Sequence, residues 1–303
     1  EKPQVLAKEI QTVVVNESVA SDFSLPINVK SETKAFSKVD IRSQTSEKVV
    51  NIGFKDGNYV NEGEVICKLD SGERLANFKR AEIGFNSAKE LSKKGLSSQS
   101  SLVAAETTFE QARIALERTN IAAPFGGFVD NLAKEGQLLQ NGQICASLVS
   151  LSPLKIVGNV SELVVSKIKP GQPVKIKLIS GEEFETAVTF VASTADSQTR
   201  TFRVESELPN EQSSVKDGLT GEMTIFTDSQ KAHFIPTSAF LLADNGDVAL
   251  ATVLNSVIRI YTVQILIDTV AGAWVTGLPE EVNIVVAGQG FVKEGEKVNS
   301  VSR

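Results

Sequence analysis

Few residues in this chain belong to the types that build metal sites and catalytic centres. Its 303 residues include one His, one Met, one Trp and two Cys. A site for a soft or borderline metal ion needs several Met, His or Cys donors close together, so we expect no metal centre. The net charge of −6 argues against a nucleic-acid partner, because such partners select basic surfaces. No apolar run reaches the roughly 20 residues of a membrane span.

The sequence is equally poor in groupings that support catalysis or hold a cofactor. His233 is the only histidine, and it lies in the strand-like segment Ala-His-Phe-Ile-Pro, where a structural role is more common than that of a general base. There is no Cys-x-x-Cys, His-Glu-x-x-His or phosphate-binding loop motif. We therefore expect a protein that is not an enzyme and binds no cofactor.

What the chain does have is an internal repeat, interrupted by a long insert. The segments Val49–Leu69 and Phe128–Leu148 align without a gap at an offset of 79 positions (136 − 57). The alignment pairs Gly57 with Gly136 and Gly63 with Gly142, and each glycine follows Asp, Glu or Asn, as in tight turns. Neither copy is long enough to bury a core alone. The repeat therefore predicts one pseudo-symmetric β-sandwich built from both copies.

The two cysteines lie in these copies but do not occupy equivalent positions. Cys145 aligns with Ile66 rather than with Cys67. Because side chains alternate along a strand, the one-residue mismatch predicts that the two thiols face opposite ways. We therefore expect two buried free thiols rather than a disulfide.

The insert, residues 71–120, is poor in Gly and Pro and rich in Ala, Glu, Lys and Leu. After the break at Lys93-Lys94-Gly95, apolar residues recur at steps of 3, 4, 3 and 4, the spacing of a two-stranded coiled coil: Leu102, Ala105, Phe109, Ala112 and Leu116. The first half has a less regular pattern: Leu75, Phe78, Ala81 or Glu82, Phe85 and Ala88. We expect an antiparallel hairpin of two helices of about 20 residues, roughly 30 Å long.

The rest of the chain shows the short, alternating segments of antiparallel β-structure. Residues 151–230 fit a small barrel, and residues 235–303 form a further strand-rich module whose natural complement is the extended N-terminal stretch. The predicted fold is mainly β with an α-helical hairpin, divided into four modules. These are a membrane-proximal β domain (1–30 with 231–303), a β-barrel (31–45 with 151–230), a lipoyl-like barrel-sandwich hybrid (46–70 with 121–150) and the hairpin (71–120).

This order of modules resembles that of periplasmic adaptor subunits. These are also called membrane fusion proteins and form the HlyD/AcrA-like family of RND-type tripartite efflux pumps. Two local stretches are similar to family segments. The segment 116–129, LERTNIAAPFGGFV, looks like the family's return from helix to sandwich, and 194–204, TADSQTRTFRV, looks like the barrel motif of adaptors that serve RND pumps.

The resemblance implies a non-enzymatic role in exporting drugs or other small molecules. It implies two partners, an inner-membrane RND transporter and a TolC-type outer-membrane channel, and self-association into a hexamer. It also implies a periplasmic location, with attachment to the inner membrane through an N-terminal lipid or helix that precedes this sequence. The exported compound is not indicated.

The resemblance also directs attention to the hairpin tip, where the family often shows Arg-x3-Leu-x6-Ser. Leu91 and Ser98 match this pattern, whereas Ser87 stands at the Arg position. The candidate channel-contact residues are Ser87, Leu91, Gly95, Leu96 and Ser98. The alternative is that Leu91 is an ordinary hairpin core residue and Ser98 a helix N-cap.

Three other functions fit parts of the pattern. Carrier domains of enzyme complexes are also pseudo-symmetric sandwiches, but they display a lipoyl or biotinyl lysine on a tight β-turn, whereas Lys93 and Lys94 lie at a helix end. Adaptors of ABC-type exporters share the modular order, but MacB-like ones have a longer loop where Leu139-Gln140-Asn141 is tight. The third is an elongated adhesin or scaffold that uses the coiled coil as a spacer.

Overall fold

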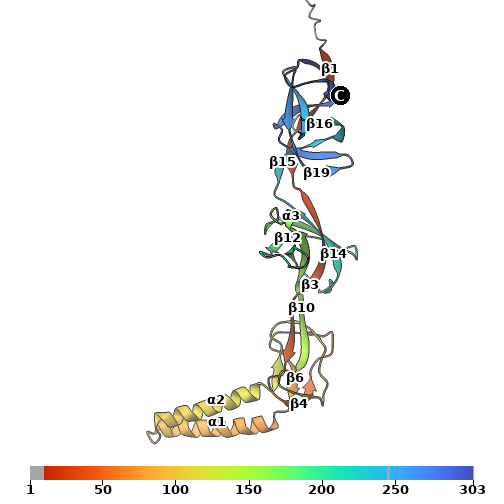
Figure 1. Cartoon of the computed structure of the whole chain (residues 1–303). Coiled ribbons are helices and arrows are strands. Elements are labelled where there is room, and N and C mark those ends of the chain that lie inside the picture. Colours follow the sequence, from red (N-terminus) through yellow and green to blue (C-terminus); the bar gives the residue numbers. More distant parts are fainter. Residues whose placement is uncertain (1–9, 244–245, 303) are drawn as a thin grey trace, which may run out of the picture. The chain divides into compact units, whose positions relative to one another are not determined.

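The computed structural model describes residues 10–243 and 246–302. The described residues fold into two compact units, one from Lys30–Val160 with Lys175–Met223, and the other from the described parts of 1–29, 161–174 and 224–303. The first nine residues of the expected membrane-proximal domain lie outside the described residues. The fold is mainly β with one helical hairpin, as the sequence predicts (Figure 1). No helix in the described part of the chain is long and apolar enough to cross a bilayer.

The two sequence repeats form one sandwich. The first copy supplies β4 (Glu47–Ile52), β5 (Tyr59–Val60) and β6 (Val65–Leu69), and the second supplies β8 (Gly127–Asp130), β9 (Leu138–Leu139) and the start of β10 (Ile144–Ser161). Strand β4 pairs with β9, and β5 pairs with β8, so strands of one copy bind strands of the other. One hydrophobic core draws buried residues from both copies. The predicted single sandwich is confirmed.

A side chain caps each of the repeated turns. In the first copy, the Lys55 N–H donates to Asn58 Oδ1 (2.9 Å), and in the second the Lys134 N–H donates to Gln137 Oε1 (3.0 Å). The other pair of turns behaves alike, with Asn61 N–H bonded to Glu64 and Gln140 N–H bonded to Gln143. The glycine in each turn has φ between 83° and 87°, a conformation that residues with a Cβ disfavour. The repeat in sequence is thus a repeat in hydrogen bonding.

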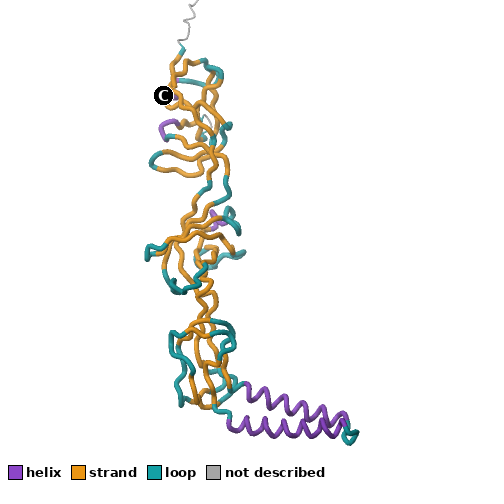
Figure 2. Tube along the Cα trace, turned by 180° about the vertical axis from the view of Figure 1, so that it is seen from behind, coloured by secondary structure: helices purple, strands orange, loops and turns teal. Residues whose placement is uncertain are grey.

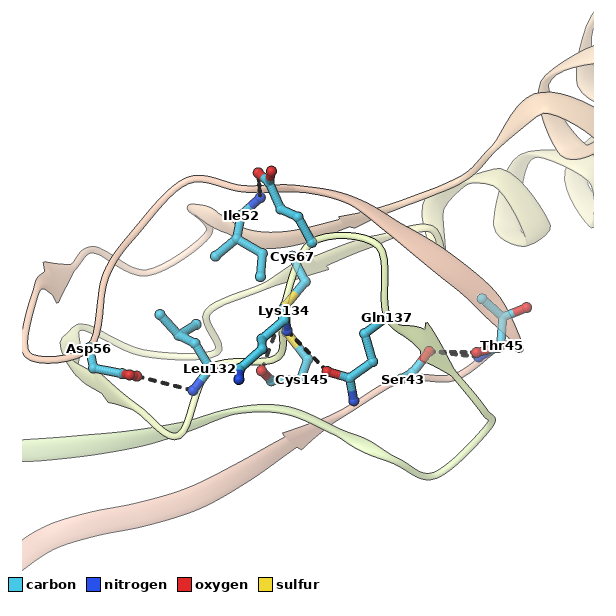
Figure 3. Close-up of a disulfide and its surroundings, with 10 residues drawn as sticks. Ser43, Thr45, Ile52, Asp56, Cys67, Leu132, Lys134, Gln137 and Cys145 are labelled. Carbon is cyan, nitrogen blue, oxygen red and sulfur yellow. Dashed lines mark hydrogen bonds between the residues drawn. A yellow bond between two sulfur atoms is a disulfide. The ribbon is translucent and has the colours of Figure 1, made fainter.

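The two cysteines form a disulfide, which corrects the expectation of free thiols (Figure 3). Strand register shifts between Val65 and Cys67 in the β6–β7 pairing, and between Ile144 and Ala146 in the β10–β3 pairing. Each cysteine therefore lies at a β-bulge, where the alternation of side chains is interrupted. Ile66 and Cys67 are both buried although they are consecutive. The alignment argument was wrong because it assumed regular strands.

Six further strand segments form a closed barrel. Its strands are β3 (Pro26–Arg42), β10, β11 (Pro173–Leu178), β12 (Glu183–Val191), β13 (Thr201–Leu208) and β14 (Thr220–Phe226). They follow the order β13-β12-β11-β14-β3-β10, and a pairing between β13 and β10 closes the ring. Alternate residues of β11, namely Val174, Ile176 and Leu178, are buried. The short helix α3 (Glu162–Val165) follows β10.

Two sheets make up the other unit. One contains β1 (Gln11–Val19), β16 (Phe240–Leu242), β17 (Val248–Leu254), β18 (Val257–Thr262), β21 (Glu281–Ala287) and β22 (Val298–Ser302). The other contains β2 (Ser21–Phe23), β15 (Gln230–Ile235), β19 (Gln264–Thr269) and β20 (Gly272–Thr276). Short 3-10 turns, η1 (Thr237–Ala239) and η2 (Gln289–Phe291), connect strands. Strand β1 pairs antiparallel with β21 and parallel with β22, which joins the N-terminal stretch to the C-terminal module.

His233 has a structural role in this unit. The side chain is buried on β15, with Nδ1 2.8 Å from Ser18 Oγ and Nε2 2.9 Å from the Pro279 carbonyl oxygen. Since a carbonyl only accepts, Nε2 carries the proton and Nδ1 accepts from the Ser18 hydroxyl. The imidazole is thus satisfied on both sides and ties β1 and the segment before β21 to β15.

Candidate functional site

The helical hairpin is formed by α1 (Gly72–Lys93) and α2 (Gln99–Glu117), which lie side by side (Figure 2). Its seam consists of half-buried residues at steps of 3 and 4. On α2 these include all five of the predicted positions: Leu102, Ala105, Phe109, Ala112 and Leu116. On α1 they are Arg74, Phe78, Ala81, Phe85, Ala88 and Ser92. The predicted coiled-coil spacing therefore describes the contact between the helices.

Aromatic contacts hold the middle of the seam. The Phe109 ring lies 5.4 Å, between centroids, from both Phe78 and Phe85, and its plane is within 12° of that of Phe85. None of the helical residues described in α1 and α2 is fully buried. A two-helix layer leaves both outer faces open to solvent, so this part of the chain has surface available for partners.

The base of the hairpin is fastened to the sandwich. The Arg74 guanidinium on α1 forms an ion pair with Glu47 on β4, at 3.1 Å between Nη2 and Oε1. The Leu69 N–H, at the end of β6, donates to the Thr119 carbonyl (2.8 Å) just after α2. The strand that enters the insert and β7 (Asn120–Ala122), which leaves it, are antiparallel neighbours. The sandwich therefore fixes the two helix ends next to each other.

The tip is a compact turn built by four of the five candidate residues. Gly95 has φ of +70°, and the backbone N–H groups of Gly95 and Leu96 donate to the carbonyls of Ser92 and Leu91, both at 2.9 Å. This pattern of hydrogen bonds is the Schellman motif that ends many helices. The next helix begins with Ser98, whose Oγ accepts from the Ser101 N–H (3.2 Å).

The five candidate residues differ in solvent exposure and in hydrogen bonding. Leu96 is 72% exposed and Leu91 46% exposed, so Leu91 is not the hairpin core residue that the alternative interpretation expected. Ser98 does cap α2, as that alternative proposed. Ser87 lies one turn before Leu91 on α1 and donates its hydroxyl to the Ile83 carbonyl (2.9 Å). The tip thus presents two exposed apolar residues, Leu91 and Leu96, on a turn whose Gly95 and Leu96 N–H groups are hydrogen-bonded.

A groove of about 410 Å³ runs along one side of the hairpin, a feature that the sequence analysis did not single out. Small residues create it, because Ala81, Gly84, Ala105 and Ala112 leave space between the helices. The remaining lining residues are Asn77, Arg80, Phe85 and Thr108. A Cβ on Gly84 would meet no atom within 4 Å, so neither crowding nor backbone strain requires this glycine. The sequence signal was a glycine in the middle of a helical pattern.

Ion pairs on the hairpin surface do not resemble a reactive site. On α2, the Arg113 pKa is raised by its hydrogen bond and charge interaction with Glu110, and further by Glu117. At the end of α1, Lys93 Nζ lies 3.0 Å from Glu90 Oε1. Lys93 and Lys94 therefore close a helix and are not displayed on a β-turn as a carrier lysine is. Within residues 10–243 and 246–302, no three His, Cys, Asp or Glu side chains gather to hold a metal ion.

The barrel segment 194–204 consists of a self-capped turn after β12 and the first four residues of β13. Asp196 Oδ1 accepts from the Thr199 N–H (2.9 Å), the Gln198 N–H (3.0 Å) and the Thr199 hydroxyl (3.0 Å). These hydrogen bonds to the ionised form lower the Asp196 pKa, and the Thr199 N–H contributes most. Arg200 follows in the left-handed region, with φ of 54°. The segment singled out by sequence thus begins with a defined loop at the barrel surface and continues into β13.

Comparison with protein families gives a match in this barrel. Residues 156–229, which cover the end of β10, α3 and β11 to β14, match the model for the "CusB-like, beta-barrel domain".

Curated relatives match over most of the chain. The solvent efflux pump periplasmic linker SrpA of Pseudomonas putida is 24% identical over 317 residues, covering 93% of this chain and 83% of the relative. The multidrug resistance protein MexA of Pseudomonas aeruginosa is 23% identical, covering 98% of this chain and 84% of the relative. The multidrug export protein AcrE of Escherichia coli is 23% identical, with 91% and 86% coverage.

Solved structures share the fold. A MacA–MexA chimeric protein carrying the Pseudomonas aeruginosa MexA α-hairpin matches with a TM-score of 0.64 and 21% identity, covering 73% of this chain and 88% of the chimera. MacA from Actinobacillus actinomycetemcomitans matches with a TM-score of 0.62 and 18% identity, covering 90% and 99%. The combination of sandwich, hairpin and barrel is therefore an architecture with known representatives.

Proposed function

The chain belongs to the periplasmic adaptors, or membrane fusion proteins, of RND-type efflux pumps, and from this premise we propose that it links an inner-membrane RND transporter to an outer-membrane channel for export of drugs or solvents. The family is not enzymatic. One observation carries the proposal: a hairpin fastened between the two halves of a single sandwich, in a chain that matches pump linkers over nearly its whole length.

We assign proposed binding partners to three of the modules predicted from the sequence. The barrel and the membrane-proximal module would contact the transporter, and the hairpin tip would contact a TolC-type channel. In the family this arrangement is periplasmic. We propose attachment to the inner membrane through an N-terminal lipid or helix encoded before residue 1. This proposal is supported by the family resemblance. Fractionating membranes from cells that express the whole gene tests it.

The tip proposal rests on the exposed pair Leu91 and Leu96. Substituting Leu96 by Asp places a charge in the proposed apolar contact and leaves the turn intact, because the Schellman hydrogen bonds use backbone groups only. We expect Leu96→Asp to lower drug resistance to that of a strain lacking the adaptor. The measurement is the minimum inhibitory concentration, with protein level and helical circular dichroism as checks on folding.

The matched control is Leu96→Met, which keeps the apolar surface and should keep resistance. A photo-crosslinking residue at position 96 should join the chain to the channel, whereas the same residue at Leu163, which is 82% exposed on α3, should not. Full resistance in Leu96→Asp, together with no channel adduct from position 96, would refute tip docking.

Self-association into a hexamer is proposed through the hairpin groove. Grooves lined by small residues allow a neighbouring helix to approach closely, and the exposed faces of α1 and α2 supply further apolar surface, including Ile83 and Val103. The occupant would be a hairpin from a second copy of this chain. The same surface would then hold the ring together along the gap between the membranes.

Gly84→Leu tests this interface, because the added side chain fills the groove without meeting atoms near its Cβ. We expect the helix to remain folded and self-association, measured by sedimentation velocity and chemical cross-linking in membranes, to fall. Asn86→Leu adds the same side chain on α1 outside the groove lining and should have no effect. Equal association of the two variants would contradict the proposed interface.

A further inference from the structure

The disulfide between Cys67 and Cys145 uses both cysteines of the chain and joins the two halves of the sandwich. The residues are 78 positions apart, and the whole hairpin lies between them. Both side chains are completely buried, in one core with residues such as Ile66, Leu69 and Leu148. The bond therefore lies inside the module rather than at its surface.

Burial restricts when this bond can form. Thiol oxidation by exchange requires an accessible thiolate that attacks a disulfide in another molecule. In the folded sandwich neither sulfur is accessible, since the exposed fraction of each cysteine is zero. The first copy also cannot close its core before the second copy arrives, because β4 and β5 pair with β9 and β8. The pairing that completes the core around Cys67 therefore requires the second copy, which follows the hairpin in the sequence.

We propose that the Cys67–Cys145 bond is introduced before this core closes by an oxidised dithiol protein, that is, a thiol–disulfide oxidoreductase of the export compartment. The thiolate of one cysteine attacks the catalyst disulfide, forms a mixed disulfide and releases one catalyst thiolate. The thiolate of the second cysteine then attacks the mixed disulfide, closes Cys67–Cys145 and releases the other catalyst thiolate. Two electrons and two protons pass from the chain's thiols to the catalyst, which leaves as a dithiol.

Once the sandwich closes, the same burial protects the bond. A reductant in solution cannot reach either sulfur unless the module opens. The cross-link is therefore a permanent structural element of the exported protein and not a switch. The inference is independent of which transporter or channel the chain serves. It makes the adaptor a client of the oxidative folding system.

The test measures the redox state of the two thiols in cells that export the full chain. Cells are quenched with acid, and the denatured protein is treated with a heavy maleimide that adds to free thiols. Chain from cells with the intact thiol–disulfide oxidoreductase, here called the oxidase, should be unshifted until reductant is added, and should then gain two adducts. In cells lacking the oxidase it should carry two free thiols and accumulate to a severalfold lower level.

A trapping experiment identifies the catalyst directly. In Cys145→Ser, the Cys67 thiol has no partner in the chain, so a catalyst whose second cysteine is replaced should remain attached as a reducible adduct. Cys67→Ala combined with Cys145→Ala is the control, and its level should not depend on the oxidase.

Three results would overturn the inference. They are two free thiols in the native chain from intact cells, complete pairing in cells without the oxidase or added oxidant, and an equal dependence of the double alanine variant on the oxidase.

Discussion

At the scale of single residues, Gly127 shows how the absence of a side chain allows two strands to pair closely. A Cβ at this position, at the start of β8, would lie 2.7 Å from the Val149 carbonyl oxygen on β10 and 3.3 Å from the Leu148 side chain. The nearest obstacle is backbone, which cannot swing away as a flexible side chain can. The close pairing of β8 and β10 in the sandwich therefore depends on glycine.

Gly127→Ala should accordingly lower the free energy of unfolding by about 1–3 kcal/mol, the usual cost of forcing an extra group into a packed site. Gly84→Ala in α1 is the matched control. Its Cβ meets nothing within 4 Å, and replacing a mid-helix glycine stabilises a helix by about 0.5–1 kcal/mol. Urea denaturation of both variants measures the difference, and similar effects of the same sign would contradict the argument.

The cysteines show why some residue-scale contacts were not predictable from the sequence. The alternation rule assigns facing directions only along a regular strand, and both cysteines lie at register shifts. Nothing in the residue types around Cys67 or Cys145 marks a bulge, since neither is a glycine position. By contrast, the side-chain caps of the repeated turns follow a readable pattern, in which Asn, Gln or Glu comes directly after the turn glycine.

At the scale of elements, the hairpin was the most predictable part of the molecule. The spacing of apolar residues on α2 predicted the seam between the helices, because contacts between paired helices follow the local period of 3 and 4 residues. The pattern on α1 was harder to read because Arg74 and Ser92 occupy its two ends. Arg74 is drawn into the seam region by Glu47 on the sandwich, a contact that helix periodicity cannot reveal. The groove at Gly84 forms because small residues of α1 and α2 lie on the same side of the hairpin. The sequence of one helix does not show which residues of the other helix lie beside it.

Phe109→Ala should weaken this element selectively. Phe109 contacts both Phe78 and Phe85, and because it is only half-buried, we expect a loss of about 2 kcal/mol, below the roughly 3–5 kcal/mol of a fully buried Phe. Hydrogen exchange followed by mass spectrometry should show faster exchange in α1 and α2, with the barrel strands unchanged. Thr107→Ala, on the exposed face of α2, is the control and should leave exchange in the helices nearly unaltered. Equal effects from both substitutions would show that the seam does not hold the hairpin together.

At the scale of the whole molecule, two compact units divide the stabilising features between them. The disulfide, the hairpin and the sandwich belong to one unit, whereas Trp274, the only tryptophan, belongs to the other. Trp274 stacks on Phe23, with ring centroids 4.4 Å apart, and lies near Phe234. The fluorescence of one residue therefore reports on one unit, and the helical circular dichroism of the hairpin reports on the other.

Removing the cross-link should separate these two signals. For a loop closed over 78 positions, the chain-entropy account gives a stabilisation of about 4.5 kcal/mol. The double variant Cys67→Ala with Cys145→Ala should therefore lose its helical signal at a lower urea concentration, while the Trp274 transition stays where it is in the native chain. A parallel shift of both transitions would mean that the two units unfold together, contrary to this prediction.

The way the insert is joined to the sandwich has a further consequence. Because β6 and β7 are paired neighbours and the Leu69 N–H binds the Thr119 carbonyl, the sandwich requires only that the inserted chain begin and end at adjacent points. Seven residues added to each helix would preserve the seam and extend the reach by about 10 Å. The length of the hairpin is therefore independent of the sandwich, and a longer or shorter hairpin would leave the contacts that hold its ends unchanged.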